Sequence, residues 1–256
     1  MDVKQSVQEH FGRAAESYAS SWPHRGGPDL DAMLEAAELG GHERVLDVGC
    51  GAGHTAFAFA GGAQEVVALD LTEAMLEQTR AGARERDLAN LEARSGDAEA
   101  LPFDDASFDI VTSRLAAHHF PHVECFVAEA HRVLRPGGRL LVSDSVSPED
   151  ATQDSYLQAI ELLRDPSHVR NHRVSQWSAM FTDTGFSEVT LLGSAPCPLD
   201  FDVWTARMHT PPDACTGLRA VFAAAPSEVR SAFALDPGAR SWQLDIAVIG
   251  ARKRLA

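Results

Sequence analysis

Between residues 44 and 143, short runs of β-branched and aliphatic residues alternate with longer stretches that are apolar along one helical face. The short runs predict strands at 44–48, 65–70, 91–95, 108–113 and 139–143, with helices between them. Consecutive strands that are joined through helices require crossover connections. The pattern therefore predicts an α/β fold, in which a parallel sheet is covered by helices on both faces.

Helical patterns also precede and follow this region. Phe11 and Tyr18 lie on the apolar stripe of a first predicted helix, and Pro28 opens a second one that ends at Gly40-Gly41. Beyond the fifth strand, the pattern predicts helices at 153–164 and 175–184, strands at 186–192 and 244–250, and further helices within the alanine-rich segment 200–235. The chain shows no internal repeat and no linker.

The charge balance excludes several classes of partner. The 256 residues include 22 Lys+Arg and 37 Asp+Glu, which gives a formal net charge of −15. Nucleic-acid binding draws much of its affinity from basic side chains that neutralise phosphates, and the chain has no basic cluster longer than 252–254. We therefore expect no binding to nucleic acid or to an anionic membrane surface. A small neutral or cationic ligand remains compatible with this charge.

Cysteine spacing and the length of apolar runs bear on whether the protein binds metal, forms disulfides or spans a membrane. The four cysteines are widely separated and form no C-x-x-C pair, which argues against a metal site and against a disulfide framework. The first residues are polar and lack the apolar core of a signal peptide. No apolar run approaches the roughly 18 residues of a membrane-spanning helix. We therefore expect a soluble, cytoplasmic protein that binds no metal.

A glycine-rich loop follows the first predicted strand and opens a helix, which is the context of a nucleotide-binding loop. Its sequence is GCGAGH, from Gly49 to His54. Glycines allow a sharp turn and let the backbone approach a ligand closely. The dinucleotide fingerprint requires a third small residue five positions after the first glycine, but His54 occupies that position. The loop therefore does not favour a dinucleotide.

Acidic residues end or follow the first three strands, at Asp47, Asp70 and Asp97. An acid at the end of the second strand is placed to accept hydrogen bonds from a ribose diol. Asp47, just before the loop, would repel a pyrophosphate but suits a ligand with an ammonium group. Each acid taken alone is also a common cap of a helix or turn. Together they indicate a nucleoside with a positively charged appendage, a description that fits S-adenosylmethionine.

On these residues, the chain resembles the class I S-adenosylmethionine-dependent methyltransferases. It is most similar to the branch of the ubiquinone/menaquinone-biosynthesis C-methyltransferases, also called methyltransferase type 11. The matching segments are LDVGCGAGH at 46–54, VALDLTEAM at 67–75, GDAEALPFDD at 96–105, FDIVTSRLAAHHF at 108–120 and RVLRPGGRLL at 132–141. The resemblance covers about residues 40–145 and weakens after Val146.

The resemblance implies a Rossmann-like fold of seven mostly parallel strands in the order 3-2-1-4-5-7-6, with 244–250 as the reversed last strand. It also implies a helical lid at 1–39 and a methyltransferase domain at 40–256, in which 146–240 shapes the substrate site. It implies S-adenosylmethionine as the cofactor. The residues implied to bind it are Asp47, Gly49, Cys50 and Gly51 at the methionine portion, Asp70 at the ribose, Leu71, Asp97 and Ala98 at the adenine, and Arg114 and Leu115 near the sulfonium.

Candidate catalytic residues lie near the expected sulfonium position. His119 follows the fourth strand and is the first candidate for substrate contact or proton acceptance; packing under the lid is the alternative. The segment from Asp165 to Arg170 concentrates polar groups in a loop, where His168 could act as base and Arg170 could hold an enolate or phenolate oxygen. A capped turn with solvated charges is the alternative there. Asp144 could orient either histidine, and Tyr18 could offer its hydroxyl to the substrate.

These observations predict methyl transfer from S-adenosylmethionine to a carbon or oxygen atom of a small aromatic, quinone-like or polyketide-like metabolite. Methyl transfer is an in-line displacement, so the enzyme must align the nucleophile and, where needed, remove its proton. Two alternatives stay open: an enzyme that binds the cofactor but catalyses cyclisation or rearrangement, and a ligand-binding protein without catalysis. The sequence also leaves open whether the chain forms a homodimer.

Overall fold

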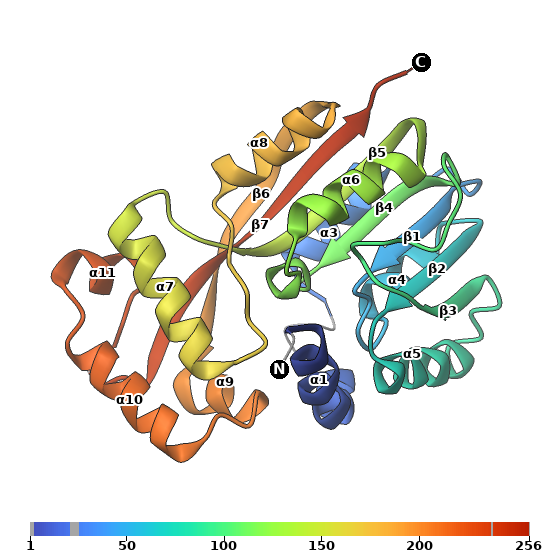
Figure 1. Ribbon diagram of the computed structural model, residues 1–256. Helices are drawn as coiled ribbons and strands as arrows, with labels where there is room; N and C mark the ends of the chain where they lie inside the picture. The colour runs from blue at the N-terminus through green and yellow to red at the C-terminus, as the bar shows by residue number, and fades with distance from the viewer. Residues whose placement is uncertain (1–2, 21–25, 237, 256) are drawn as a thin grey trace.

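The computed structural model describes residues 3–20, 26–236 and 238–255, with the backbone alone for residues 13–20. Its centre is a seven-stranded sheet in the order β3-β2-β1-β4-β5-β7-β6 (Figure 1). The strands are β1 (Arg44–Val48), β2 (Glu65–Asp70), β3 (Leu91–Ser95), β4 (Phe108–Arg114), β5 (Leu134–Val146), β6 (Phe186–Asp200) and β7 (Ser241–Lys253). The predicted strand order is confirmed.

Strand directions follow the prediction as well. The pairs β1–β2, β1–β4, β2–β3 and β4–β5 are parallel, whereas β7 runs antiparallel to both β5 and β6. The last two strands are longer than predicted because they pair with each other from Phe186↔Lys253 to Asp200↔Ser241. Pro196 and Pro198 lie within β6, which is the edge strand of the sheet, where a residue without an N–H is tolerated.

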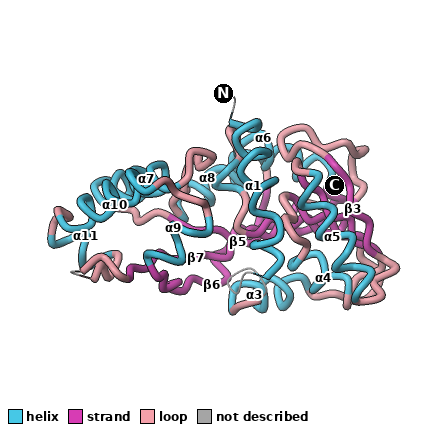
Figure 2. Tube along the Cα trace, turned by 90° about the horizontal axis from the view of Figure 1, so that it is seen from below, coloured by secondary structure: helices cyan, strands magenta, loops and turns pink. Residues whose placement is uncertain are grey.

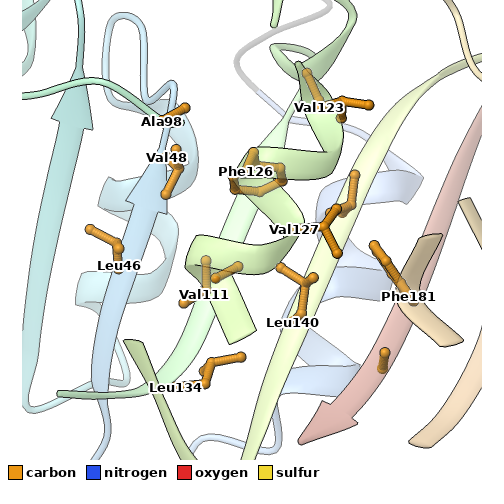
Figure 3. Close-up of a cluster of buried hydrophobic side chains, with 14 of the residues drawn as sticks. Leu46, Val48, Ala98, Val111, Val123, Phe126, Val127, Leu134, Leu140 and Phe181 are labelled. Atoms are coloured by element: carbon orange, nitrogen blue, oxygen red, sulfur yellow. The ribbon is translucent and has the colours of Figure 1, made fainter. Parts of the chain in front are cut away.

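Helices cover both faces of the sheet. On one face, α6 (Val123–Val133) and α8 (Val174–Thr184) place Phe126 and Phe181 in one apolar cluster with Leu46, Val111 and Leu140 of the sheet, as Figure 3 shows. On the other face lie α3 (Pro28–Ala37), α4 (His54–Ala60) and α5 (Glu73–Glu85), whose buried side chains meet those of β1, β2 and β4. The central strands β1, β2 and β4 are therefore buried on both sides, which explains their near-continuous apolar sequences.

The far halves of β6 and β7 extend beyond the central sheet and carry a separate apolar core. Trp204, Phe222 and Trp242 are its largest buried side chains. The helices around it are α7 (Ala151–Arg164), α9 (Phe201–Arg207), α10 (Pro212–Ala223) and α11 (Ser227–Ala232). We call this unit, residues 151–164, 197–236 and 238–244, the C-terminal lobe. It lies to one side of the sheet, and α1 (Val3–Ser20) lies between the lobe and α5 (Figures 1 and 2).

Candidate functional site

The glycine loop turns sharply at the carboxyl end of β1. The backbone N–H groups of Gly49 and Cys50 both donate to the carbonyl of Leu69, at 2.8 and 3.0 Å, and fix the loop to β2. Gly49 has φ +70°, and a Cβ added there would come within 2.6 Å of the Ala116 Cβ. Gly51 has φ +53°, and a Cβ added there would meet nothing within 4 Å. Gly51 therefore presents bare backbone to open space, as a cofactor cradle requires.

This open space belongs to a cavity at the carboxyl ends of the parallel strands, which we call the first cavity. It encloses about 960 Å³ when counted out to its mouth, a volume suited to a small ligand. Every residue predicted to bind the cofactor, apart from Asp47, lines it. These residues are Gly49, Cys50, Gly51, Asp70, Leu71, Asp97, Ala98, Arg114 and Leu115.

Asp70 stands at the centre of the first cavity's wall. Its two carboxylate oxygens accept hydrogen bonds from the backbone N–H of Gly51, at 2.8 Å, and of Thr72, at 2.9 Å. These bonds fix the carboxylate and leave each oxygen a further lone pair. Burial raises the pKa of Asp70. The arrangement fits an acid that accepts hydrogen bonds from ribose hydroxyls.

Asp97 marks the point where α1 closes over the first cavity. Lys4 Nζ lies 2.6 Å from a carboxylate oxygen of Asp97 and 2.6 Å from one of Glu99. Nearby, the Gln8 side chain donates to the carbonyl of Leu71 at 3.0 Å. The N-terminal helix is thus bonded to the same two segments that were predicted to hold the adenine. Sequence reasoning missed Lys4, because no local pattern relates it to an acid 93 residues away.

Arg114 brings a positive charge to the first cavity. Its guanidinium is held by two hydrogen bonds to Asp29 of α3, at 2.6 and 3.1 Å, and is almost fully buried. The next residue, Leu115, adopts φ +52°, a left-handed conformation that is uncommon for a branched residue. Its N–H donates to the carbonyl of Ser143 at 2.8 Å. Such backbone outliers concentrate at functional sites, and Leu115 lines two cavities.

Asp47 lies behind the glycine loop and does not line the first cavity. It pairs in register with Thr112 of β4, whose hydroxyl donates to the Asp47 carboxylate at 2.8 Å. Asp47 is only 1 % exposed, and this burial raises its pKa to about 7. The side chain therefore supports the loop from inside the sheet. The sequence predicted contact with the ligand because it placed Asp47 at a strand end without showing where the side chain points.

A second cavity of about 670 Å³ lies between the sheet and the C-terminal lobe. It shares Phe11, Leu115 and His119 with the first cavity, so these three side chains stand where the two cavities meet. The remaining lining residues are His118, Ser145, Glu161, Arg164, Asp165, Asn171, Cys197, Leu199, Trp204, Arg207, Leu244 and Ile246. The second cavity is thus positioned to hold a molecule beside whatever occupies the first.

Two adjacent histidines in the wall of the second cavity have opposite environments. His118 Nδ1 donates to Asp144 at 2.6 Å, and the backbone N–H of His118 donates to the other carboxylate oxygen at 3.1 Å. Burial opposes the charge of His118, but attraction and hydrogen bonding from Asp144 outweigh it and raise the pKa. His119 Nδ1 donates to the carbonyl of Ser167 at 3.0 Å. Burial and the neighbouring His118 lower the pKa of His119 to about 4.

His168 and Arg170, two of the predicted substrate contacts, line neither cavity. Their loop is fixed by two backbone N–H groups, of Val169 and Arg170, that donate to the carbonyl of His118. His168 lies behind His118 and donates to Gln158 at 3.3 Å, and burial lowers its pKa to about 2. The Arg170 guanidinium instead pairs with Asp154 at 2.6 Å.

Asp144 and Tyr18 complete the set of predicted residues. Asp144 lines neither cavity, and it orients His118 rather than His119 or His168, the two histidines that the sequence offered for this role. The side chain of Tyr18 lies outside the described residues. Sequence reasoning missed His118 as the oriented histidine and missed Asn171 altogether. The adjacent pair HH was visible in the sequence, but its pairing with an acid 26 residues away was not.

Comparison with known proteins identifies the class to which this protein belongs. The family described as "Methyltransferase domain" matches residues 46–142. The uncharacterized methyltransferase YcgJ of Bacillus subtilis is 41% identical over 205 residues, covering 79% of this chain and 80% of that protein. Together with the fold and the first cavity, these matches show that the chain belongs to the class I S-adenosylmethionine-dependent methyltransferases.

Two further comparisons place the chain within this class. The crystal structure of YcgJ superposes with a TM-score of 0.85 at 38% identity, covering 89% of this chain and 99% of that one. The ubiquinone/menaquinone biosynthesis C-methyltransferase of Dinoroseobacter shibae is 43% identical over 130 residues, which is 49% of this chain and 52% of that protein.

Within the described residues, no helix is both long and apolar enough to cross a membrane.

Proposed function

We propose that this methyltransferase transfers the methyl group to a carbon or oxygen atom of a small metabolite bound in the second cavity. The observation that carries the proposal is the Asp144–His118 pair in the wall of that cavity, next to the three side chains shared with the first cavity. S-adenosylmethionine supplies an electrophilic methyl carbon on a sulfonium. The chain therefore needs to hold the acceptor beside it and to remove a proton where the nucleophile carries one.

In this proposal the first cavity holds the cofactor. The backbone of Gly49, Cys50 and Gly51 takes the methionine portion, and Asp70 takes the ribose hydroxyls. Leu71 packs on the adenine, and Asp97 and Ala98 contact its polar edge. Arg114 and Leu115 lie beside the methionine end and the junction with the second cavity. The fit is supported by the open backbone at Gly51 and by the spare lone pairs of Asp70. The N-terminal helix serves as a lid that Lys4 fastens.

His118 is the proton acceptor in this proposal. Asp144 holds the hydrogen on Nδ1, so the neutral imidazole keeps its lone pair on Nε2, and His118 lines the second cavity. The carboxylate of Asp144 raises the pKa of His118, which makes it a stronger base than an ordinary histidine. His119 remains a contact residue at the junction of the cavities. Its pKa of about 4 makes it a weak base, although it was the first candidate from the sequence.

The acceptor is proposed to be an apolar or aromatic metabolite with a reactive oxygen. Trp204, Leu199 and Ile246 form an apolar wall in the second cavity, and Phe11 closes it toward the first. A flat ring or an alkyl chain would pack against these side chains, while its polar atoms face His118. This supports the aromatic, quinone-like or polyketide-like acceptors that the sequence suggested.

The test begins with calorimetry of S-adenosylhomocysteine and continues with a panel of phenols, hydroquinones and β-dicarbonyl compounds incubated with S-adenosylmethionine. We expect binding of S-adenosylhomocysteine and at least one product heavier by a methylene group, detected by mass spectrometry. Turnover to a product of unchanged mass would favour cyclisation or rearrangement instead. Absence of S-adenosylhomocysteine binding would refute the assignment of the first cavity.

A further inference from the structure

The two asparagines of the chain have very different surroundings. The side-chain amide of Asn90 donates to the carbonyls of Ala60 and Ala63, at 2.9 and 3.0 Å. Asn171 is 1 % exposed and lines the second cavity, and its Oδ1 accepts a hydrogen bond from the Ser145 hydroxyl. Its Nδ2, however, has no hydrogen-bond partner within the part of the chain that the structure describes. Asn171 therefore brings an unused donor to the cavity.

An unpaired N–H group buried in a protein costs free energy, and such groups are rare in native structures. The rest of Asn171 is well fixed, because its backbone N–H donates to Gln158 at 3.0 Å and its carbonyl accepts from the Gln158 amide at 2.9 Å. The side chain is therefore held in place with its donor unsatisfied. A ligand oxygen in the second cavity would satisfy it.

Asn171 is also connected to His118. Ser145, which donates to the Asn171 Oδ1, directly follows Asp144 in β5, and both its backbone N–H and its hydroxyl face the Asp144 carboxylate, at 2.8 and 3.4 Å. The same carboxylate oxygen accepts from His118 Nδ1. His118 and Asn171 are thus supported by two consecutive residues and belong to one hydrogen-bond chain. Both line the second cavity, so a molecule that contacts both needs two polar atoms.

The charged groups nearby do not require a charged ligand. Arg164 is paired with Glu161 at 2.9 Å, and both side chains are buried. The Arg164 guanidinium also donates to the carbonyl of Trp204 at 3.1 Å. Asp165 accepts two hydrogen bonds from Ser167. Arg164, Glu161 and Asp165 are thus satisfied by the protein. Two buried donors of the cavity wall, the Asn171 Nδ2 and the Trp204 Nε1, have no hydrogen-bond partner among the described residues, and of the two Asn171 is the one linked to His118.

We propose that Asn171 determines the acceptor specificity of the second cavity by donating a hydrogen bond to a second oxygen, next to the position that His118 activates. The acceptor class is a molecule with two oxygen atoms on neighbouring carbons, such as a catechol or an enolised α-diketone. The inference rests on the proposed function, because it takes His118 as the group that faces the reacting position.

The test compares two coloured probes, nitrocatechol and para-nitrophenol, which differ in the second oxygen. Each is titrated by absorbance into the protein saturated with S-adenosylhomocysteine. We expect the wild type to bind nitrocatechol about tenfold more tightly, the gain of one buried hydrogen bond. In Asn171→Ala and in Asn171→Leu, which keeps the volume of the side chain, the preference should fall to less than about twofold. Asn90→Ala, which removes the other asparagine amide, should keep it.

The outcomes separate the two proposals. A preference that survives in a folded Asn171→Ala or Asn171→Leu protein overturns the role of Asn171. So does a wild type that binds S-adenosylhomocysteine but does not prefer nitrocatechol. Failure of S-adenosylhomocysteine to bind the wild type is measured first and would instead refute the proposed function. Thermal unfolding of each variant establishes that it folds.

Discussion

The two cavities of this methyltransferase are built in different ways. The first is lined mainly by four short segments that follow β1, β2, β3 and β4. The second is lined by side chains from positions between Phe11 and Ile246, which the β5–β7–β6 pairing and the C-terminal lobe bring together. Under the proposed function, cofactor binding is thus encoded mainly in local sequence, whereas acceptor binding depends on contacts between distant parts of the chain.

The difference extends to the ionisable groups. In the first cavity, Asp70 and Asp97 are held by backbone N–H groups and by Lys4, and their task is to bind. In the second, the adjacent His118 and His119 have pKa values that are displaced in opposite directions. Neighbouring groups with separated pKa values are typical of acid–base chemistry. Substitutions in the two cavities should therefore affect different measured quantities.

The largest expected effect belongs to the second cavity. His118→Gln removes the proposed base, so kcat with a hydroxyl acceptor found in the panel should fall by about 10²–10⁴-fold. The Kd for S-adenosylhomocysteine, measured by calorimetry, should stay unchanged because His118 does not line the first cavity. His168→Gln is the matched control, because His168 lies beside His118 but lines neither cavity. In this variant, kcat should fall by less than about tenfold.

Equal losses in the two histidine variants would contradict the assignment and would return His168 to the active role that the sequence suggested. An equal weakening of S-adenosylhomocysteine binding would show instead that the cavities are not independent. Either result would remove the division between local cofactor binding and long-range acceptor binding.

The next effect belongs to the first cavity. Asp70→Ala removes the carboxylate proposed for the ribose hydroxyls, and hydrogen bonds to a charged group are worth about 1.5–3 kcal/mol. Calorimetry should therefore show S-adenosylhomocysteine binding weakened by roughly 10- to 150-fold. As a control, Asp31→Ala changes an acid of α3 outside both cavity walls and should leave the Kd within about twofold. Unchanged binding in Asp70→Ala would refute its role.

The pH dependence of turnover offers a third comparison. His118 must be neutral to accept a proton, and its pKa lies above 6.5 because Asp144 outweighs burial. Glu161 and Asp165 also raise this pKa, and the charges of His118 and His119 oppose each other. The kcat/KM should therefore fall about tenfold per pH unit below that pKa and level off above it. S-adenosylhomocysteine binding should not follow this profile.

Asp144→Asn tests whether His118 is the group that titrates in the pH profile. It removes the negative charge that raises the His118 pKa but keeps the size of the side chain. The midpoint of the kcat/KM profile should move to lower pH, and kcat on the plateau should fall because the histidine is less well oriented. A midpoint that stays in place would show that a different group titrates.

The sheet order was expected from the family resemblance, whereas the parallel strands, the glycine loop and the acids of the first cavity could be predicted from local sequence for a physical reason. Strand, loop and acid follow one another within a few residues, as in the segment from Val45 to Gly53, and a parallel sheet brings successive strand ends to one edge. The tight turns with positive φ at Gly49 and Gly51 can likewise be predicted from the local sequence, because glycine adopts positive φ readily. Such features need no knowledge of distant contacts.

The second cavity could not be predicted in the same way. Its shape depends on the pairing of β6 with β7 as far as Asp200↔Ser241, which continues well past the predicted ends of both strands. His118 and Asp144 meet because β4 and β5 are neighbours, and Asn171 joins them because its loop is fixed to the carbonyl of His118 through Val169. The sequence showed a polar loop at 165–170 but could not show which of its side chains would face inward.

The smallest effect on binding is expected at Asp47. Its carboxylate is behind the loop, so Asp47→Asn should change the Kd for S-adenosylhomocysteine by less than about threefold. The same substitution should alter stability. The folded pKa of about 7 lies above the usual value of 3.8, so the wild type loses stability as pH rises between these values. Asparagine cannot ionise, and the variant should lack this loss.

Urea unfolding at pH 5 and pH 8 measures the stability effect directly. Relative to the wild type, Asp47→Asn should gain stability between the two pH values, by at most ~3 kcal/mol, because only the two pKa units between pH 5 and the folded pKa of about 7 fall within this window. If Asp47 instead binds the ammonium group of the cofactor, as the sequence predicted, the Kd should weaken more than tenfold. That result would place a deeply buried side chain among the groups that bind the ligand. Cofactor binding would then depend on a residue that does not line the first cavity.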